Sequence, residues 1–114
     1  MTRYAPKSDL EVLQGTLDLL VLKALGAGPL HGWAISRRIR DLSSDVLSVN
    51  QGSLYPALYR LEERGWIVGQ DAQSPEGRRI RVYRSTAAGR RQVVREVETW
   101  DLYAAAMRRV ILAT

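Results

Sequence analysis

Residues 50–69, NQGSLYPALYRLEERGWIVG, restrict the possible folds more than any other part of this sequence. Leu54, Leu58 and Leu61 recur at the spacing of a helix, so that one helical face can be buried. Gly65 then supplies the left-handed residue that commonly ends a helix. The residues after it are typical of a strand. This stretch therefore predicts a helix, a stop and a strand.

The face opposite these leucines carries polar side chains of a kind that contacts DNA. Short hydrogen-bond donors and acceptors at the start of a helix can bind phosphates and base edges, although the same pattern also fits a merely solvated face. Because Pro56 removes one helical hydrogen bond, we expect the regular helix to begin near Ser53 or its first turn to be bent. The candidate DNA contacts on this helix are Asn50, Gln51, Ser53, Tyr55, Pro56, Tyr59 and Arg60.

Two further helices are predicted before this stretch. The capping box SDLE at residues 8–11 indicates that the first begins near residue 9 and runs to about residue 25. Its second half is apolar around nearly its whole circumference, so a second subunit or the last helix must cover it on more than one side. Gly28 and Pro29 interrupt the pattern, and a second helix should run from residue 30 or 31 to residue 42. A short extended segment around Leu47 follows.

The residues after Gly65 predict a β-hairpin with a basic face. We expect strands at residues 66–71 and 78–85, joined by a turn-rich loop. In the second strand, Arg79, Arg81 and Tyr83 should form the outer face, opposite Ile80 and Val82. The candidate contacts with the DNA backbone or minor groove are Arg78, Arg79 and Arg81. The alternative is an ordinary charged edge strand that resists aggregation.

A final helix is predicted from residue 87 to residue 112, with Thr86 as its amino-terminal cap. Apolar positions within it recur in steps of four and three, the spacing of a coiled-coil seam. The seam consists of Val93, Val97, Trp100, Ala104, Met107 and Ile111. It is too short for a free coiled coil, so we expect a dimer-forming helix with additional contacts. We therefore divide the chain into a DNA-binding domain at 1–86 and a dimerisation helix at 87–114.

The composition narrows the classes of function. The formal net charge of +5 favours an acidic partner, and nucleic acid is the commonest one for a small basic protein. With one histidine, no cysteine and no phosphate-binding glycine loop, we expect no catalytic residue, metal or cofactor. Neither a signal peptide nor a membrane-spanning apolar stretch is visible. We expect a soluble cytoplasmic protein that is not an enzyme and has no membrane partner.

The order helix, helix, helix, hairpin and long helix is that of a winged helix-turn-helix, mainly α with a small β wing. Four blocks in this order resemble the PadR family of bacterial transcriptional regulators: LQGTLDLLVLKAL (13–25), GPLHGWAI (28–35), GSLYPALYRLEERGWI (52–67) and GRRIRVYRSTAAGRR (77–91). The single terminal helix resembles the short subfamily. Trp33 and Tyr59 stand where the family more often has Tyr and His. These differences leave the DNA sequence that the protein recognises open.

The resemblance implies a homodimeric repressor that binds a pseudo-palindromic operator in double-stranded DNA. Additional candidate backbone contacts from the first two helices are Lys7, Thr16, His31, Trp33 and Arg37. The resemblance also implies that Trp100 lines a cavity that accepts a small, flat hydrophobic effector, with plain dimer packing as the alternative. A function of another class is a winged helix that docks on another protein without sequence-specific DNA binding.

Overall fold

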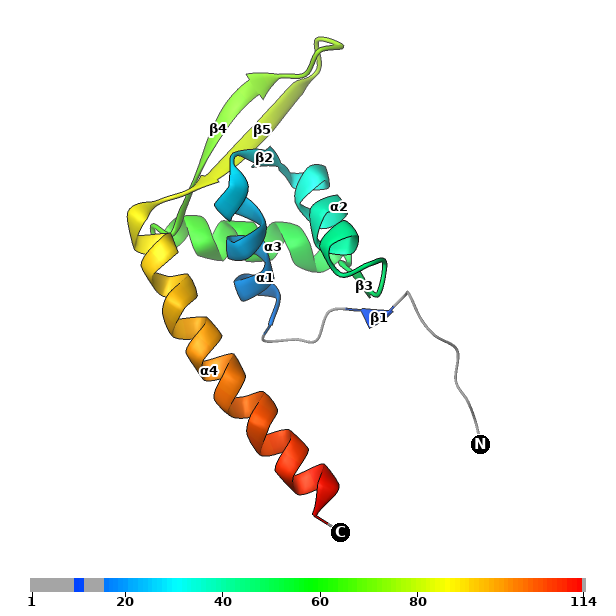
Figure 1. Ribbon diagram of the computed structural model, residues 1–114. Helices are drawn as coiled ribbons and strands as arrows, with labels where there is room; N and C mark the ends of the chain where they lie inside the picture. Colours follow the sequence, from blue (N-terminus) through cyan, green and yellow to red (C-terminus); the bar gives the residue numbers. More distant parts are fainter. Residues whose placement is uncertain (1–9, 12–15, 114) are drawn as a thin grey trace.

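Three short helices form the body of the protein, and a fourth, long helix extends away from it (Figure 1). The computed structural model describes residues 10–11 and 16–113. The helices are α1 (Leu17–Ala24), continued by a 3-10 turn at Leu25–Ala27, α2 (Gly32–Leu42), α3 (Gln51–Glu63) and α4 (Ala87–Leu112). Because α4 projects from the body, the described chain is elongated, with extents of 56 × 31 × 22 Å.

Two small sheets accompany the helices. The strands are β1 (Leu10–Glu11), β2 (Leu30–His31), β3 (Leu47–Ser48), β4 (Ile67–Gln73) and β5 (Arg79–Ser85). Strands β4 and β5 form an antiparallel hairpin that projects beyond the helices (Figure 1), and β2 pairs with β5 on its other side. Strand β1 pairs in parallel with β3. The predicted fold class, mainly α with a small β wing, is confirmed.

The core lies where α1, α2 and α3 meet the base of the hairpin. Leu54, Leu58 and Leu61 of α3 are at most 1% exposed, which confirms the helical face predicted from their spacing. The buried apolar residues of the core are Leu17, Val21, Leu22, Ala24, Leu25, Ile35, Ile39, Leu54, Ala57, Leu58, Leu61, Ile67 and Tyr83. This packing gives α3 a fixed position under the hairpin.

The predicted start of the first helix was wrong. Helix α1 begins at Leu17, while Leu10 and Glu11 form strand β1, opposite Leu47 and Ser48 of β3. The capping pattern is local, whereas the backbone partner of residues 10–11 lies more than thirty positions away along the chain, so the pattern could not reveal it. Ser8 and Asp9 of the capping box lie outside the described residues.

Helix α2 begins at Gly32, two residues after the first position predicted. Leu30 and His31 form β2, opposite Tyr83 and Val82 of β5. His31 is the amino-terminal cap of α2, because its Nδ1 accepts a hydrogen bond from the Ala34 N–H at 3.4 Å. The extended segment predicted around Leu47 is confirmed as β3.

Helix α3 begins at Gln51, two residues before the start near Ser53 that was one of the two alternatives drawn from Pro56. Its cap is Asn50, whose Oδ1 accepts the Gly52 N–H at 2.7 Å. The N–H groups of Ser53 and Leu54 both donate to the Asn50 carbonyl, at 2.9 and 3.0 Å. Helical bonding is therefore established before the chain reaches Pro56, which lies inside the helix.

The stop after α3 is confirmed. Gly65 has a φ of 75°, and the Trp66 N–H folds back to the Leu61 carbonyl at 3.0 Å, as in a Schellman motif. The hairpin strands run to Gln73 and from Arg79, so β4 is longer than predicted and the turn is shorter. The prediction that Tyr83 lies on an outer face was wrong, since Tyr83 is 6% exposed and belongs to the core.

Helix α4 begins at Ala87, and its predicted cap is confirmed by a 3.0 Å hydrogen bond from the Gly89 N–H to the Thr86 hydroxyl. The Thr86 hydroxyl also donates to the Gly65 carbonyl at 2.7 Å, and the Thr86 N–H donates to the Trp66 carbonyl at 3.0 Å. The end of α3 and the start of α4 are thus joined directly. None of the described helices is both long enough and apolar enough to cross a lipid bilayer.

Candidate nucleic-acid interface

Helix α3 turns its polar face away from the core. Tyr55 and Tyr59 lie one turn apart on this face and are 49% and 64% exposed. Gln51 and Ser53 are exposed in the first turn, where the positive end of the helix dipole favours negative groups. The exposed face therefore combines hydroxyl and amide groups that can bond to phosphates and base edges.

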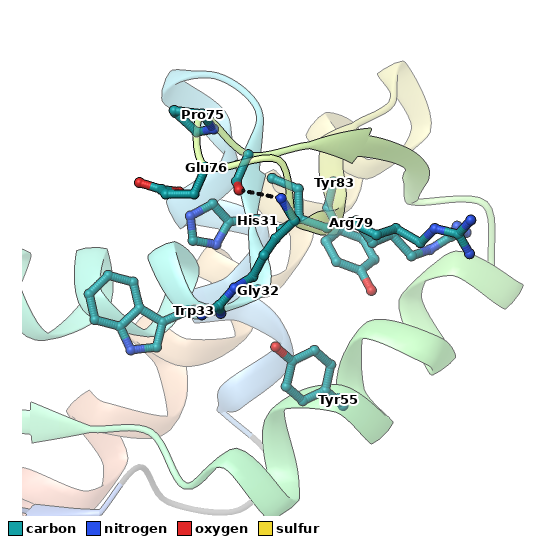
Figure 2. Close-up of a pocket in the computed structure, with 12 residues that line it drawn as sticks. His31, Gly32, Trp33, Tyr55, Pro75, Glu76, Arg79 and Tyr83 are labelled. Carbon is teal, nitrogen blue, oxygen red and sulfur yellow. Dashed lines mark hydrogen bonds between the residues drawn. The ribbon is translucent and has the colours of Figure 1, made fainter.

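The position of Tyr55 depends on a glycine in another helix. Tyr55 rises from α3 toward Gly32 at the start of α2 (Figure 2). A Cβ atom on Gly32 would lie 2.6 Å from the Tyr55 hydroxyl and 2.9 Å from its ring. The missing side chain at Gly32 therefore makes room for the tyrosine. This role of Gly32 could not be predicted from the sequence, because it depends on which side chain lies beside the glycine in the fold.

A row of flat side chains lies beside Tyr55 at the start of α2. Trp33 is 57% exposed, and the His31 imidazole stacks on it with a centroid separation of 6.3 Å and an interplanar angle of 12°. The Arg37 guanidinium lies 5.2 Å from the centroid of the same indole, a cation–π contact. This row presents Arg37 at the surface in a defined orientation.

Hydrogen bonds connect this row to α3. Gln51 Nε2 donates to the Ser36 hydroxyl oxygen at 3.3 Å, and the Ser36 hydroxyl donates to the Trp33 carbonyl at 2.9 Å. The beginnings of α2 and α3 therefore form one continuous surface. Ser36 is a further residue that the sequence analysis missed, since a single serine on a helix carries no recognisable signal.

The hairpin, residues 67–85, is the wing of this protein and borders a groove of about 680 Å³ (Figure 2). Ser74 holds the turn at the tip of the wing: its N–H donates to the Arg78 carbonyl at 2.8 Å, and its hydroxyl accepts the Arg78 N–H at 3.0 Å. The groove is lined by His31, Gly32, Trp33, Tyr55, Ser74, Pro75, Glu76, Arg78, Arg79, Ile80, Arg81 and Tyr83. It thus brings together predicted residues from α2, α3 and the wing.

The candidate arginines fall into two groups. Arg78 and Arg79 are exposed, and within the part of the chain that the structure describes neither forms an ion pair. Arg60 Nη2 contacts Asp18 Oδ1 of α1 at 2.8 Å, and Arg81 forms ion pairs within the protein. The hydrogen bond to the Glu62 carboxylate, together with its charge, raises the pKa of Arg81 above its ordinary value. Arg78 and Arg79 therefore contribute most to a positive potential beside the groove.

The other candidate contacts do not all lie at this surface. Pro56 is exposed on α3 next to Tyr55. Thr16 is half-buried and lines a different cavity. Lys7 lies outside the described residues.

The second cavity is apolar, has a volume of about 370 Å³ and lies between α1 and α4. Trp100 and Val97 contribute to it from the predicted seam and are 40% and 36% exposed. Its lining consists of Thr16, Leu19, Leu20, Lys23, Leu47, Val97 and Trp100. The remaining seam residues line no part of it, and Met107 and Ile111 are 44% and 68% exposed.

Comparisons with known proteins identify the family and the fold of this chain. The sequence model of a family described as the transcriptional regulator PadR-like family matches residues 21–95. A transcriptional regulator of Mycobacterium tuberculosis is 35% identical over 80 residues, which are 70% of this chain and 71% of that protein.

Solved structures show the same fold. A transcriptional regulator from Clostridium thermocellum has a TM-score of 0.76 and 27% identity, over 84% of this chain and 90% of that chain. PadR of Bacillus subtilis, solved in complex with operator DNA, has a TM-score of 0.66 and 20% identity, over 75% of this chain and 48% of that chain. The chain belongs to the PadR-like family of transcriptional regulators.

Proposed function

We propose that this protein is a homodimeric repressor that binds a pseudo-palindromic operator through α3 and the wing. The main support is the groove that exposed Tyr55 of α3 and exposed Arg79 of the wing both line. A polar helix face for base edges beside free cations for phosphates is the combination that DNA recognition needs. The operator complex of Bacillus subtilis PadR, which has the same fold, agrees with this proposal.

Within this proposal the residues have different tasks. The first-turn side chains and the tyrosines of α3 read base edges or adjacent phosphates, while Arg37, Arg78 and Arg79 contact the backbone. Trp33 and His31 orient Arg37 and border the groove. Arg60 and Arg81, whose carboxylate partners lie on other elements at 2.8 and 2.9 Å, act mainly by holding α3 and the wing in place. The ion pair of Arg37 with Asp41, one turn along the same helix, is longer, at 4.0 Å, and exposed, so it leaves Arg37 available to a phosphate.

Dimerisation is assigned to residues 87–114, and DNA binding to residues 1–86. The support is the exposed apolar surface of the last turns of α4, where the seam residues Met107 and Ile111 are 44% and 68% exposed. Apolar surface of this extent on a projecting helix favours burial against a second copy. Light scattering at micromolar concentration is expected to give twice the chain mass of 12.8 kDa. A monomer under these conditions would contradict the dimer.

The cavity between α1 and α4 is proposed to bind a small, flat hydrophobic effector. Its walls are leucines, a valine and the Trp100 indole, together with Thr16 and the exposed Lys23. Such a lining favours planar apolar compounds that stack on the indole. An occupant would act by shifting α4 relative to α1, and with it the distance between the two copies of α3.

Tryptophan fluorescence tests the effector. Addition of planar aromatic compounds should change the emission of the wild-type protein, because Trp100 lies in the cavity wall. The response should persist in Trp33→Phe, whose indole lies in the groove, and disappear in Trp100→Phe. If a varied panel of compounds leaves the emission unchanged, Trp100 only packs the dimer.

The rival function is a winged helix that docks on another protein and carries an incidental positive charge. Heparin chromatography and a gel-shift assay with the protein's own promoter DNA distinguish the two. A DNA-binding regulator elutes late from heparin and shifts the promoter at physiological salt, with affinity that falls steeply as salt rises. Early elution and no shift would favour the docking module.

A further inference from the structure

Glu62, in the last turn of α3, contacts both strands of the wing through one carboxylate oxygen. Its Oε2 accepts a hydrogen bond from Arg81 Nη2 of β5 at 2.9 Å and another from the Gly69 N–H of β4 at 3.0 Å. Strand β4 is the outer strand of its sheet, so this N–H has no neighbouring strand to pair with. The carboxylate therefore serves as the missing partner for the edge of the wing.

Two further features fix the position of Arg81. A Cβ atom on Gly69 would lie 2.6 Å from Arg81 Nε, so the absence of a side chain at position 69 leaves room for the guanidinium beside Glu62. Arg81 Nη1 also contacts Asp71, its cross-strand neighbour, at 3.2 Å. The Glu62 side chain is 27% exposed, whereas that of Asp71 is 73% exposed. The pair with Glu62 is therefore the less screened of the two.

The wing has a second anchor on its opposite side. Strand β2 pairs with β5 at Val82 and Tyr83, whereas the outer part of the wing projects beyond the helices (Figure 1). Arg78 and Arg79 lie in this outer part, next to the turn. Ile67 and Tyr83 hold the base of the hairpin in the core, but without Glu62 the part of β4 beyond Gly69 could twist about β5. Contact between Glu62 and β4 restrains that movement from the side of α3.

We propose that Glu62 is a positioning residue that holds the wing at the angle at which Arg78 and Arg79 reach the DNA backbone. This inference rests on the proposed DNA-binding function. The expected change in DNA affinity is opposite to the change that charge alone would cause. Removal of a negative charge near DNA normally strengthens binding, whereas removal of Glu62 should weaken it, because two phosphate contacts are lost or become disordered.

The test compares Glu62→Ala with Glu63→Ala in promoter binding. Both variants remove one carboxylate from the last turn of the same helix, and Glu63 is exposed. We expect Glu63→Ala to bind as tightly as wild type or more tightly, and Glu62→Ala to bind about tenfold more weakly. The slope of log K against log salt should also become shallower by about two in Glu62→Ala. Equal or tighter binding by Glu62→Ala would overturn the proposal.

A measurement without DNA separates this inference from the proposed function. Amide hydrogen exchange at Gly69 should be faster in Glu62→Ala than in wild type and unchanged in Glu63→Ala. Glu62→Gln, which keeps one acceptor oxygen without the charge, should be intermediate in both exchange and DNA binding. Unchanged exchange in a folded Glu62→Ala variant would refute the restraint itself. If exchange changes as expected but the wild-type protein binds no DNA, only the proposed function fails.

Discussion

The double variant Tyr55→Ala/Arg79→Ala is expected to lose specific promoter binding, with a fall in affinity of about a hundredfold or more. The two side chains lie in the same groove but come from different elements, and they would make different contacts, one at base edges and one at a phosphate. Their losses should therefore add. Fluorescence anisotropy with labelled promoter DNA at physiological salt measures the change.

The control for this experiment is Arg91→Ala. Arg91 is exposed in the first turns of α4 and does not line the groove. Arg91→Ala therefore shows how much DNA affinity is lost when one positive charge is removed outside the groove. Binding should stay within a few-fold of wild type. Both variants should remain folded, because Tyr55, Arg79 and Arg91 lie outside the core. Undiminished binding by the double variant would refute the assignment of the groove.

Gly89→Ala is expected to destabilise the protein by about 2–3 kcal/mol. Gly89 is buried in the first turn of α4, and a Cβ atom there would overlap the carbonyl oxygen of Trp66. This clash involves backbone, so it can be relieved only if α4 moves away from the start of β4. The intrinsic preference of alanine for helices, about 1 kcal/mol over glycine, offsets only part of the cost.

Chemical denaturation measures the effect, with Gly26→Ala as the matched control. A Cβ atom on Gly26 would meet no atom within 4 Å, so this variant should be neutral or slightly more stable than wild type. If Gly89→Ala unfolds at the same denaturant concentration as wild type, the close packing of α4 on Trp66 does not contribute to stability.

The parts of the fold that the sequence predicted depend on signals close together in the chain. The leucine spacing of α3, the stop at Gly65 and the cap at Thr86 each involve residues within one or two helical turns, and all are confirmed. The strands β1 and β2 were missed because local patterns assigned their residues to the starts of helices. Their partners lie far away in the chain, at Leu47 and at Tyr83.

The candidate site was predictable to a similar extent. The sequence identified Tyr55 and Arg79, which the fold brings to one groove. It could not show that Arg81 is paired with Glu62, nineteen residues away. Nor could it show that Gly32 makes room for Tyr55, because the sequence does not reveal that the two residues are neighbours in the fold. Family membership confirms the expectation of a transcriptional regulator rather than an enzyme.

The contacts at Gly65, Thr86 and Gly89 join the start of α4 to the end of α3. A small rotation of α4 at this junction therefore displaces its far end. Twenty-six residues of helix span about 39 Å at 1.5 Å per residue. A rotation of about ten degrees at the junction therefore moves the far end by about 7 Å, a fifth of the ~34 Å between successive major grooves. In the proposed dimer, the three hydrogen bonds around Thr86 thus contribute to the distance between the two copies of α3.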